Sequence, residues 1–295
     1  MARRLPFLLL SLSPLLPLGA EPLSAQEPAR EHVEEKEQNQ EQDQTWQVSF
    51  SPNYSIGDYG QGSNTTIYYL PLSVQRLFRD GDITVVVPYI IVKGDCSVVL
   101  LSGVPNRTNQ RCGAPDPVRG RHRKSPHVPD PVVTNSGLGD VVLRGRYYLV
   151  DGQDWVPTIA VTARIKFPTA DADKGLGTGE FDEGFGLELT KTLGEKWVAF
   201  GDTGYTMIGK PQGIPLRNQW YYDVGLGYYV VKGLMVSAYY EWYRALLQGF
   251  QDPQDFLFAV SYSLTASWQV NLSTQIGLSD GSPAYALGFG IGYGF

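Results

Sequence analysis

Pairs of charged residues two positions apart are the feature of this sequence that offers the most chemistry. Arg144 and Arg146 form one basic pair, and Arg164 and Lys166 form a second. Successive side chains of a β-strand point to opposite faces, so residues two apart share a face. Two such strands side by side bring four cations onto one surface, where they bind carboxylates or orient a polar solute.

Carboxylates at matching positions supply the opposite charge. Asp140 shares the face of Arg144, and antiparallel pairing places it opposite Arg164 or Lys166. Asp202 is a weaker candidate because its segment alternates poorly. The prediction is a basic wall opposed to an acidic one: Arg144, Arg146, Arg164 and Lys166 against Glu188, Asp223 and Glu241. The alternative is that these charges pair with each other and fill a rigid interior.

Hydrolytic catalysis has little support in this sequence. A side chain that transfers protons near neutral pH is usually a histidine. His32, His122 and His127 all lie outside the candidate strands. We therefore predict no catalytic residue, no cofactor and no enzyme activity; the alternative, a lipid-modifying enzyme, predicts altered lipids on expression.

Acidic residues also crowd one candidate loop, at Asp171, Asp173, Glu180, Asp182 and Glu183. Carboxylate oxygens suit calcium. Because no full ligand pattern is present, a solvated charged loop is the favoured interpretation, and no metal site is predicted.

Two cysteines and a cluster of basic residues mark a long connection at 93–136. Cys96 and Cys112 predict a disulfide in an oxidising compartment, with a gain on the order of 3 kcal/mol; metal binding is the poorer alternative. The basic residues either neutralise lipopolysaccharide phosphates, attract anionic solutes or are simply solvated: Arg107, Arg111, Arg119, Arg121, Arg123 and Lys124.

The elements that position these residues follow from alternation of large and small side chains. The terminal segment YALGFGIGYGF (285–295) sets aromatic and aliphatic residues against glycine and alanine. This period of two predicts a β-strand with its heavy face in lipid and its small face inside a barrel. Similar segments predict twelve strands: 46–56, 65–78, 82–92, 137–150, 154–167, 180–192, 196–208, 218–231, 234–244, 254–265, 267–278 and 284–295.

The connections alternate between tight and long, as in outer-membrane barrels with short periplasmic turns and longer extracellular loops. Tryptophans at the strand ends form two girdles, Trp46, Trp155, Trp197 and Trp268 on the periplasmic side, and Trp220 and Trp242 on the outer side. A water-soluble barrel or sandwich is the alternative, but such a fold would not need glycine on its second face.

The first 45 residues differ from the rest. Arg3 and Arg4 precede an apolar run and small residues, which predicts a signal peptide at 1–25; a retained anchor is the alternative. Residues 26–45 are polar and acidic and predict a disordered leader before a barrel at 46–295. The net charge of −6 gives no indication of nucleic-acid binding.

Several motifs resemble the outer-membrane β-barrel transporter family named after the MetA-pathway of phenol degradation. The matching residues include Gly81–Asp82, Val87–Tyr89, SGLGD at 136–140 and KFPTADADK at 166–174. The resemblance implies an outer-membrane channel of a Gram-negative bacterium for small, often aromatic compounds. The terminal strand ending at Phe295 resembles the signal recognised by the barrel assembly machinery.

We therefore predict a twelve-stranded antiparallel barrel after a signal peptide. Its predicted function is passive diffusion of small molecules, including aromatic or hydrophobic compounds, through the outer membrane. A closed structural or surface-binding barrel that acts through its loops is the second hypothesis. The expected partners are outer-membrane lipid, lipopolysaccharide, the assembly machinery and a small-molecule solute.

Overall fold

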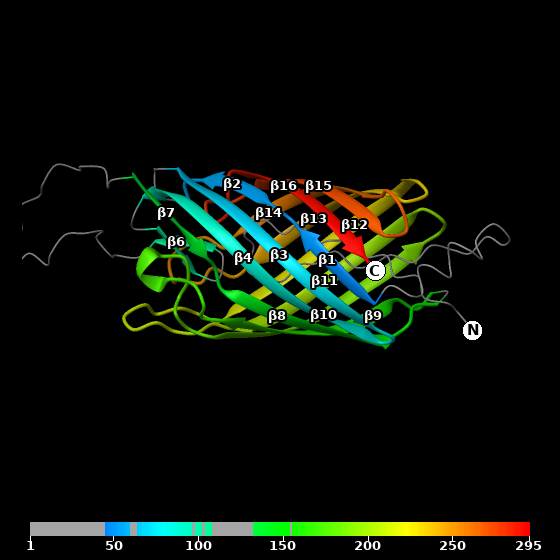
Figure 1. Ribbon diagram of the computed structural model, residues 1–295, viewed down its shortest axis with the longest axis horizontal. Coiled ribbons are helices and arrows are strands. Elements are labelled where there is room, and N and C mark those ends of the chain that lie inside the picture. Colours follow the sequence, from blue (N-terminus) through cyan, green and yellow to red (C-terminus); the bar gives the residue numbers. More distant parts are fainter. Residues whose placement is uncertain (1–44, 60–63, 96–97, 102–103, 108–131, 154) are drawn as a thin grey trace, which may run out of the picture.

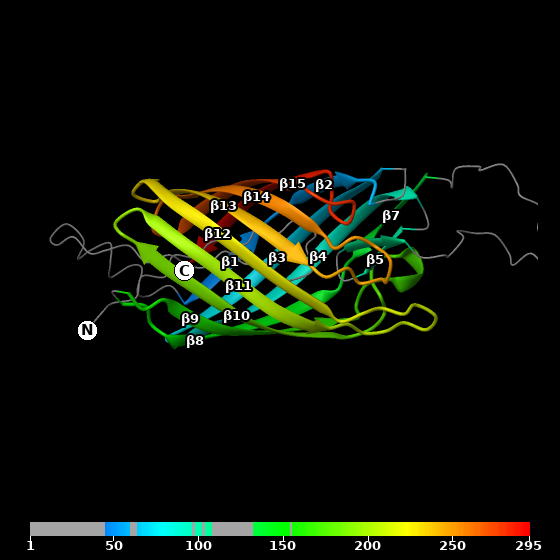
Figure 2. The ribbon, with the colours of Figure 1, turned by 180° about the vertical axis from the view of Figure 1, so that it is seen from behind.

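The computed structural model describes residues 45–59, 64–95, 98–101, 104–107, 132–153 and 155–295. Its regular secondary structure is antiparallel β-sheet apart from one short helix, and the main sheet closes into one barrel (Figures 1 and 2). The main sheet has 14 strand segments. Two wall positions are each built from two consecutive segments, so the barrel has twelve positions. The predicted fold class is confirmed.

The strands of the main sheet are β1 (Trp46–Phe50), β2 (Asn53–Gly57), β3 (Thr65–Phe78), β4 (Gly81–Asp95), β7 (Val132–Leu138), β8 (Val141–Val150), β9 (Thr158–Phe167), β10 (Asp182–Leu193), β11 (Trp197–Met207), β12 (Gln219–Val231), β13 (Leu234–Tyr243), β14 (Gln254–Ser263), β15 (Trp268–Gly277) and β16 (Tyr285–Gly294). A separate hairpin is formed by β5 (Val98–Leu101) and β6 (Val104–Arg107), and one short 3₁₀-helix, η1 (Ala172–Lys174), lies between β9 and β10.

The barrel closes where its first wall position meets its last strand. β16 pairs with β1 and β2, and both of these pair with β3 on their other side. Pro52 separates β1 from β2; it has no N–H to give to a ladder, so the strand is interrupted there. A second interruption, at Gly139 and Asp140, divides β7 from β8, and both segments pair with β4.

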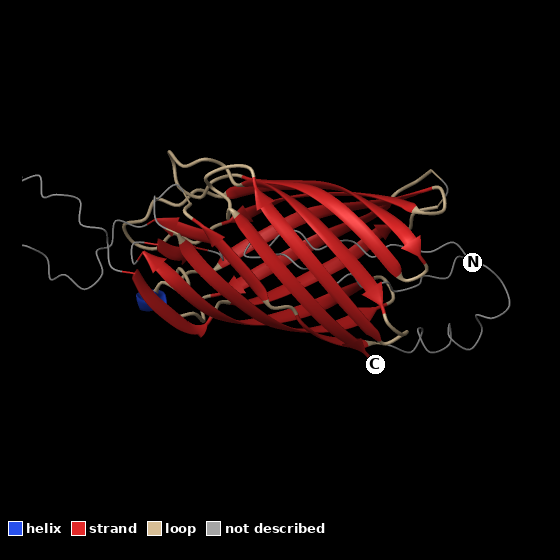
Figure 3. Cartoon of the chain, turned by 90° about the horizontal axis from the view of Figure 1, so that it is seen from above, coloured by secondary structure: helices blue, strands red, loops and turns tan. Residues whose placement is uncertain are grey.

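The two ends of the barrel differ in the length of their connections (Figure 3). One end carries the tight turns, such as 194–196 between β10 and β11 and 232–233 between β12 and β13. The backbone N–H groups of Thr45 and Trp46 donate to the carbonyl oxygen of Phe295 at this same end. The long connections 168–181, 208–218 and 244–253 lie at the other end, which we call the outer mouth.

The outer surface of the wall is apolar along its length. In β16 the large side chains are exposed, except for the half-buried Ile291, while alanine and glycine face inward and are buried. Leu272, Val224 and Phe258 on three other strands are also exposed, at 58%, 53% and 43%. The buried residues of the strands include many polar and charged ones. An apolar exterior and a polar interior are the pattern of a transmembrane barrel of the outer-membrane type. Within the described ranges, no helix is long and apolar enough to cross a membrane.

Several boundaries differ from the sequence-based prediction. The strand predicted at 137–150 begins earlier, at Val132, because its first part continues the pairing with β4 beyond the interruption. The strand predicted at 154–167 begins only at Thr158, whose hydroxyl accepts a hydrogen bond from the N–H of Gly152 and so ends the turn. The long connection at 93–136 contains β5 and β6, which the sequence analysis did not predict.

Candidate functional site

The predicted basic residues gather on the inner face of β8 and β9. Arg144 is the direct cross-strand partner of Arg164, and Arg146 is opposite Thr162. Lys166 pairs across the strands with Val142. Three of these residues, Arg144, Arg146 and Arg164, border an open pocket whose space, counted together with the solvent at its opening, is about 440 Å³. The pocket is also lined by Asp82, Glu188, Thr84, Thr162, Phe185 and Tyr221 among others. The structure therefore places a patch of basic side chains inside the barrel. The carboxylates and aromatic rings around each of them determine how much of this positive charge is left to act on a solute.

Arg146 bridges the strands on either side of it. Its Nε lies 2.8 Å from Oε2 of Glu188 on β10, and its Nη1 lies 3.4 Å from Oδ2 of Asp82 on β4. All three side chains are buried, at 9% exposure or less. The sequence analysis placed Glu188 on the opposite wall and did not select Asp82. Asp82 and Thr84 are two residues apart and therefore share the inner face of the strand. This spacing could have identified Asp82 from the sequence.

Lys166 is the centre of a second ion-pair cluster near the outer mouth. Its Nζ lies 2.9 Å from Oδ2 of Asp140 and 3.0 Å from Oδ2 of Asp182. The ammonium also donates to the hydroxyl of Thr178, at 2.9 Å, and its side chain is only 2% exposed. The sequence analysis counted Asp182 with the acidic residues of a loop, although it also lay within the predicted strand 180–192; it is the first residue of β10, paired with Lys166 across the strands.

Arg164 differs from Arg146 and Lys166 because its guanidinium contacts an aromatic ring. Its guanidinium carbon lies 5.5 Å from the ring centroid of Tyr221, and its Nη2 donates to the hydroxyl of Thr206. Its Nη1 is buried without an acceptor among the described residues. Gly184 on β10 leaves the space that the arginine side chain fills, since a Cβ there would come within 2.5 Å of Nε.

Carboxylates on five adjacent strands form one continuous line across the inner face. Each is the direct cross-strand partner of the next: Glu188, Asp202, Asp223, Glu241 and Asp255. We call this line the carboxylate row; every member is at most 9% exposed. Asp202 belongs to it although its strand alternates poorly in sequence. Asp255 was missed, because its position near the strand end and its register with Glu241 are set only by the pairing of β13 with β14.

Aromatic side chains share the interior with these charges. The rings of Tyr221 and Tyr243 stack with centroids 5.8 Å apart and an interplanar angle of 24°. Inward glycines make room for them: a Cβ at Gly204 would lie 2.4 Å from the hydroxyl of Tyr221, and one at Gly225 would lie 2.2 Å from the ring of Tyr239. Large side chains from neighbouring strands therefore cover part of the small inner face of these strands. Only the remaining part of that face can border open space in the barrel.

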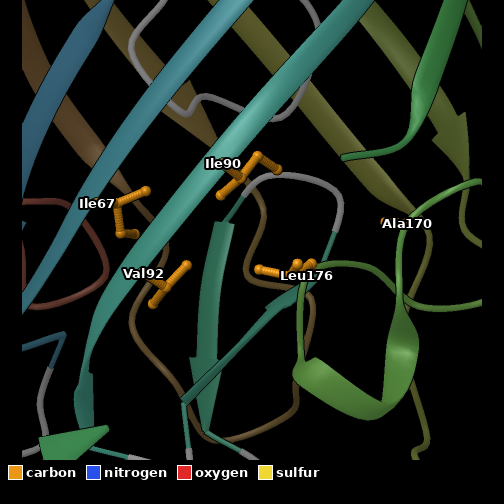
Figure 4. Packing of buried hydrophobic residues seen from close by; sticks show 5 residues of the cluster. All are labelled: Ile67, Ile90, Val92, Ala170 and Leu176. Carbon is orange, nitrogen blue, oxygen red and sulfur yellow. The ribbon is translucent and has the colours of Figure 1, made fainter. Parts of the chain in front are cut away.

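The connection between β9 and β10 contributes two side chains, Ala170 and Leu176, to a buried apolar cluster (Figure 4). Its Leu176 packs against Ile67, Ile90 and Val92 on the inner faces of β3 and β4. The backbone N–H of Ala170 in the same connection donates to Oδ1 of Asp140, at 3.0 Å. This described segment is therefore held against the inner faces of β3 and β4.

The other acidic residues of that connection do not converge on a common point. Asp171 accepts a hydrogen bond from Lys174 and lies 3.0 Å from its ammonium, contacts that lower the pKa of Asp171. Asp182 is held by Lys166. In the part of the chain that the structure describes, no three His, Cys, Asp or Glu side chains are grouped so as to hold a metal ion.

Some predicted features lie outside the described residues. These are the signal peptide at 1–25, the leader at 26–45 except its last residue, the proposed Cys96–Cys112 disulfide and the three histidines. Most of the basic loop lies there as well.

Comparisons with known proteins agree with this geometry. The family model for the MetA-pathway of phenol degradation matches residues 106–295. The chain belongs to this family. No curated protein matches it in sequence. Among solved structures, an outer membrane channel from Pseudomonas putida F1 is similar with a TM-score of 0.61 and 13% identity, covering 85% of this chain and 96% of that one.

Further solved structures are less similar. The NanC porin matches with a TM-score of 0.48 and 11% identity over 84% of this chain and 99% of that chain. The CymD monoaromatic hydrocarbon channel has a TM-score of 0.43 and 8% identity over 85% and 89%. At these identities the likeness to the Pseudomonas putida channel establishes the barrel fold, and the residues of the interior carry the argument about function.

Proposed function

We propose that this chain is a passive channel for small molecules in the outer membrane of a Gram-negative bacterium. The observation that carries the proposal is the charged interior. Arg144 and Arg164 on β8 and β9 border the cavity, and the carboxylate row crosses the strands beside it. A barrel whose interior served only to hold the wall together gains more from well-packed apolar residues than from buried charges. A field across the lumen instead orients and selects solutes.

The solutes we propose are small and carry a polar or charged group. Aromatic compounds, which the family description suggests, fit if they also bear such a group, because Tyr221 and Tyr243 offer ring faces next to the charges. Of the predicted lumen residues, Arg144 and Arg164 are assigned to selectivity. Arg146, Lys166, Asp140 and Glu188 are assigned to holding the ion-pair clusters that fix the wall around them.

Single-channel recording in planar bilayers tests this function. The purified barrel is expected to give stable conductance steps, and replacing Arg144 and Arg164 by alanine is expected to change its ion selectivity. Arg76→Ala is the matched control, since Arg76 lies outside the lumen with its guanidinium 5.0 Å from the Trp46 ring. A folded barrel that inserts but never conducts would remove the channel.

The second candidate function is a closed barrel that acts through its surface loops. It is favoured by one observation, the segment that packs Leu176 against Ile67, Ile90 and Val92 at the outer mouth. A barrel without conductance whose loops bind purified lipopolysaccharide would support this candidate. Unchanged lipid profiles on expression would dismiss the alternative of a lipid-modifying enzyme.

The route to the membrane and the partners there complete the proposal. We propose that residues 1–25 are removed on export and that the assembly machinery recognises the terminal strand ending at Phe295. The basic residues between 107 and 124 are proposed to contact lipopolysaccharide phosphates, with Cys96 and Cys112 joined at the base of that loop. Deletion of Phe295 tests the assembly signal: it leaves the pairing of β16 with β15 intact but removes the hydrogen bonds of Phe295 with Thr45 and Trp46.

A further inference from the structure

Among the described residues, the inner face of the barrel carries more carboxylates than the basic residues there hold in ion pairs. Arg146 and Lys166 each hold two carboxylates in the ion pairs described above. Four members of the carboxylate row remain, and none of them forms an ion pair with a described basic residue: Asp202, Asp223, Glu241 and Asp255. Arg164, the basic residue bordering this region, is occupied by an aromatic ring and a threonine hydroxyl.

The spacing within the row makes this excess of negative charge costly. Neighbouring strands lie about 4.8 Å apart, and side chains directly opposite each other have Cβ atoms about 4.5–5.5 Å apart. Like charges in that position destabilise a sheet. The pairs Asp202–Asp223, Asp223–Glu241 and Glu241–Asp255 are all of this kind. A cation placed along the row would relieve the repulsion at several contacts at once.

Two buried groups show where such a cation would sit. Asp202 is 9% exposed, and neither of its carboxylate oxygens accepts a hydrogen bond from a described residue. Its negative charge lies between those of Glu188 and Asp223 along the row. The side chain of Tyr243 is fully buried and lies two residues after Glu241 on the inner face of β13.

The aromatic pair beside the row specifies the kind of cation. The faces of tyrosine rings attract ammonium and guanidinium groups. The barrel already contains one such contact, because the guanidinium of Arg164 lies over the ring of Tyr221. Tyr221 in turn stacks on Tyr243. Carboxylates next to stacked rings are complementary to a cation that carries both N–H donors and an apolar part.

We infer that the carboxylate row, together with Tyr221 and Tyr243, binds small organic cations that bear an ammonium or guanidinium group. The N–H donors bond to neighbouring carboxylates, and the carbon part of the ligand packs on the rings. A calcium ion fits less well, because it takes six to eight oxygens around one point and the row extends across separate strands. Passage of these cations through the barrel rests on the proposed channel function, whereas their binding to the carboxylate row does not depend on it.

The first experiment measures permeation with methylguanidinium chloride as the probe. Reversal potentials across a planar bilayer with a gradient of this salt are expected to show a preference for the cation. Asp202→Asn together with Asp223→Asn should lower the permeability ratio of methylguanidinium to chloride about tenfold. Glu183→Gln is the matched control, because Glu183 lies on the exposed face of β10 and its loss should leave the ratio unchanged.

The second experiment measures binding without conductance. Calorimetric titration of methylguanidinium chloride into the detergent-solubilised barrel should give saturable binding that weakens about tenfold in the double variant. A conducting barrel whose ratio and binding are the same in the double variant overturns the inference and leaves the channel intact. Calcium chloride binding in preference to methylguanidinium overturns it as well. A barrel that binds the probe but never conducts refutes the channel and supports the site.

Discussion

Removing the ammonium of Lys166 should be among the most damaging single changes inside the barrel. This group lies 2.9 Å from a carboxylate oxygen of Asp140 and 3.0 Å from one of Asp182, with its side chain 2% exposed. Lys166→Met keeps most of the aliphatic volume and removes only the charge and its hydrogen bonds. Two buried carboxylates then face each other without the cation between them.

The expected loss follows from what each carboxylate keeps. Breaking a buried ion pair by removing one partner costs about 3–5 kcal/mol. Asp140 retains the backbone N–H of Ala170 at 3.0 Å, and Asp182 retains that of Gly209 at 2.9 Å. Hydrogen bonds to charged groups contribute about 1.5–3 kcal/mol each. These retained donors place the predicted loss in the free energy of unfolding near the lower end, about 3 kcal/mol.

The assay is urea unfolding of the barrel in lipid vesicles, followed by tryptophan fluorescence. Lys174→Met is the matched control: Lys174 is 56% exposed in its pair with Asp171, so its loss should cost less than about 1 kcal/mol. Adding Asp140→Asn and Asp182→Asn to Lys166→Met should recover part of the stability, because no unpaired charge remains. A Lys166→Met barrel within about 1 kcal/mol of the native protein would refute this account of the cluster.

Two further predictions concern the two faces of the wall. Gly204→Ala should lower the free energy of unfolding by about 1–3 kcal/mol, because the added methyl group would meet a tyrosine hydroxyl at 2.4 Å and strand backbone at 2.5 Å. Gly201→Ala is the control and should be tolerated, because the nearest contact of its added methyl group is 3.9 Å away. Equal stability of the two variants in urea unfolding would contradict the close packing at Gly204. Leu272→Arg, in the middle of β15 on the exposed face, should cost about 2–4 kcal/mol in vesicles, and Leu278→Arg beyond the strand end about 1 kcal/mol or less. If the two cost the same, the depth assigned to the lipid is wrong.

The sequence determined the architecture because the wall of a membrane barrel has a local signature. Successive residues of a strand face lipid and the barrel interior in turn, so their side chains alternate in size and polarity. The alternation in 285–294 and 268–277 is therefore enough to assign both strands and both faces. The positions of tight and long connections then fixed which end carries the termini. The inward direction of Arg144, Arg146, Arg164 and Lys166 follows from the same period of two.

Only the tertiary structure decided which charges meet. Whether Asp202 faces Asp223, or Asp255 faces Glu241, depends on the register of separate hairpins, and a shift of one residue would reverse every side chain of a strand. The sequence therefore predicted two opposed walls, whereas the fold joins Arg146 to Glu188 and leaves the remaining acidic residues in one line. The sequence also did not predict which side chains fill the interior. An inward glycine suggests open space in the sequence, whereas in the structure a side chain from the next strand occupies that space.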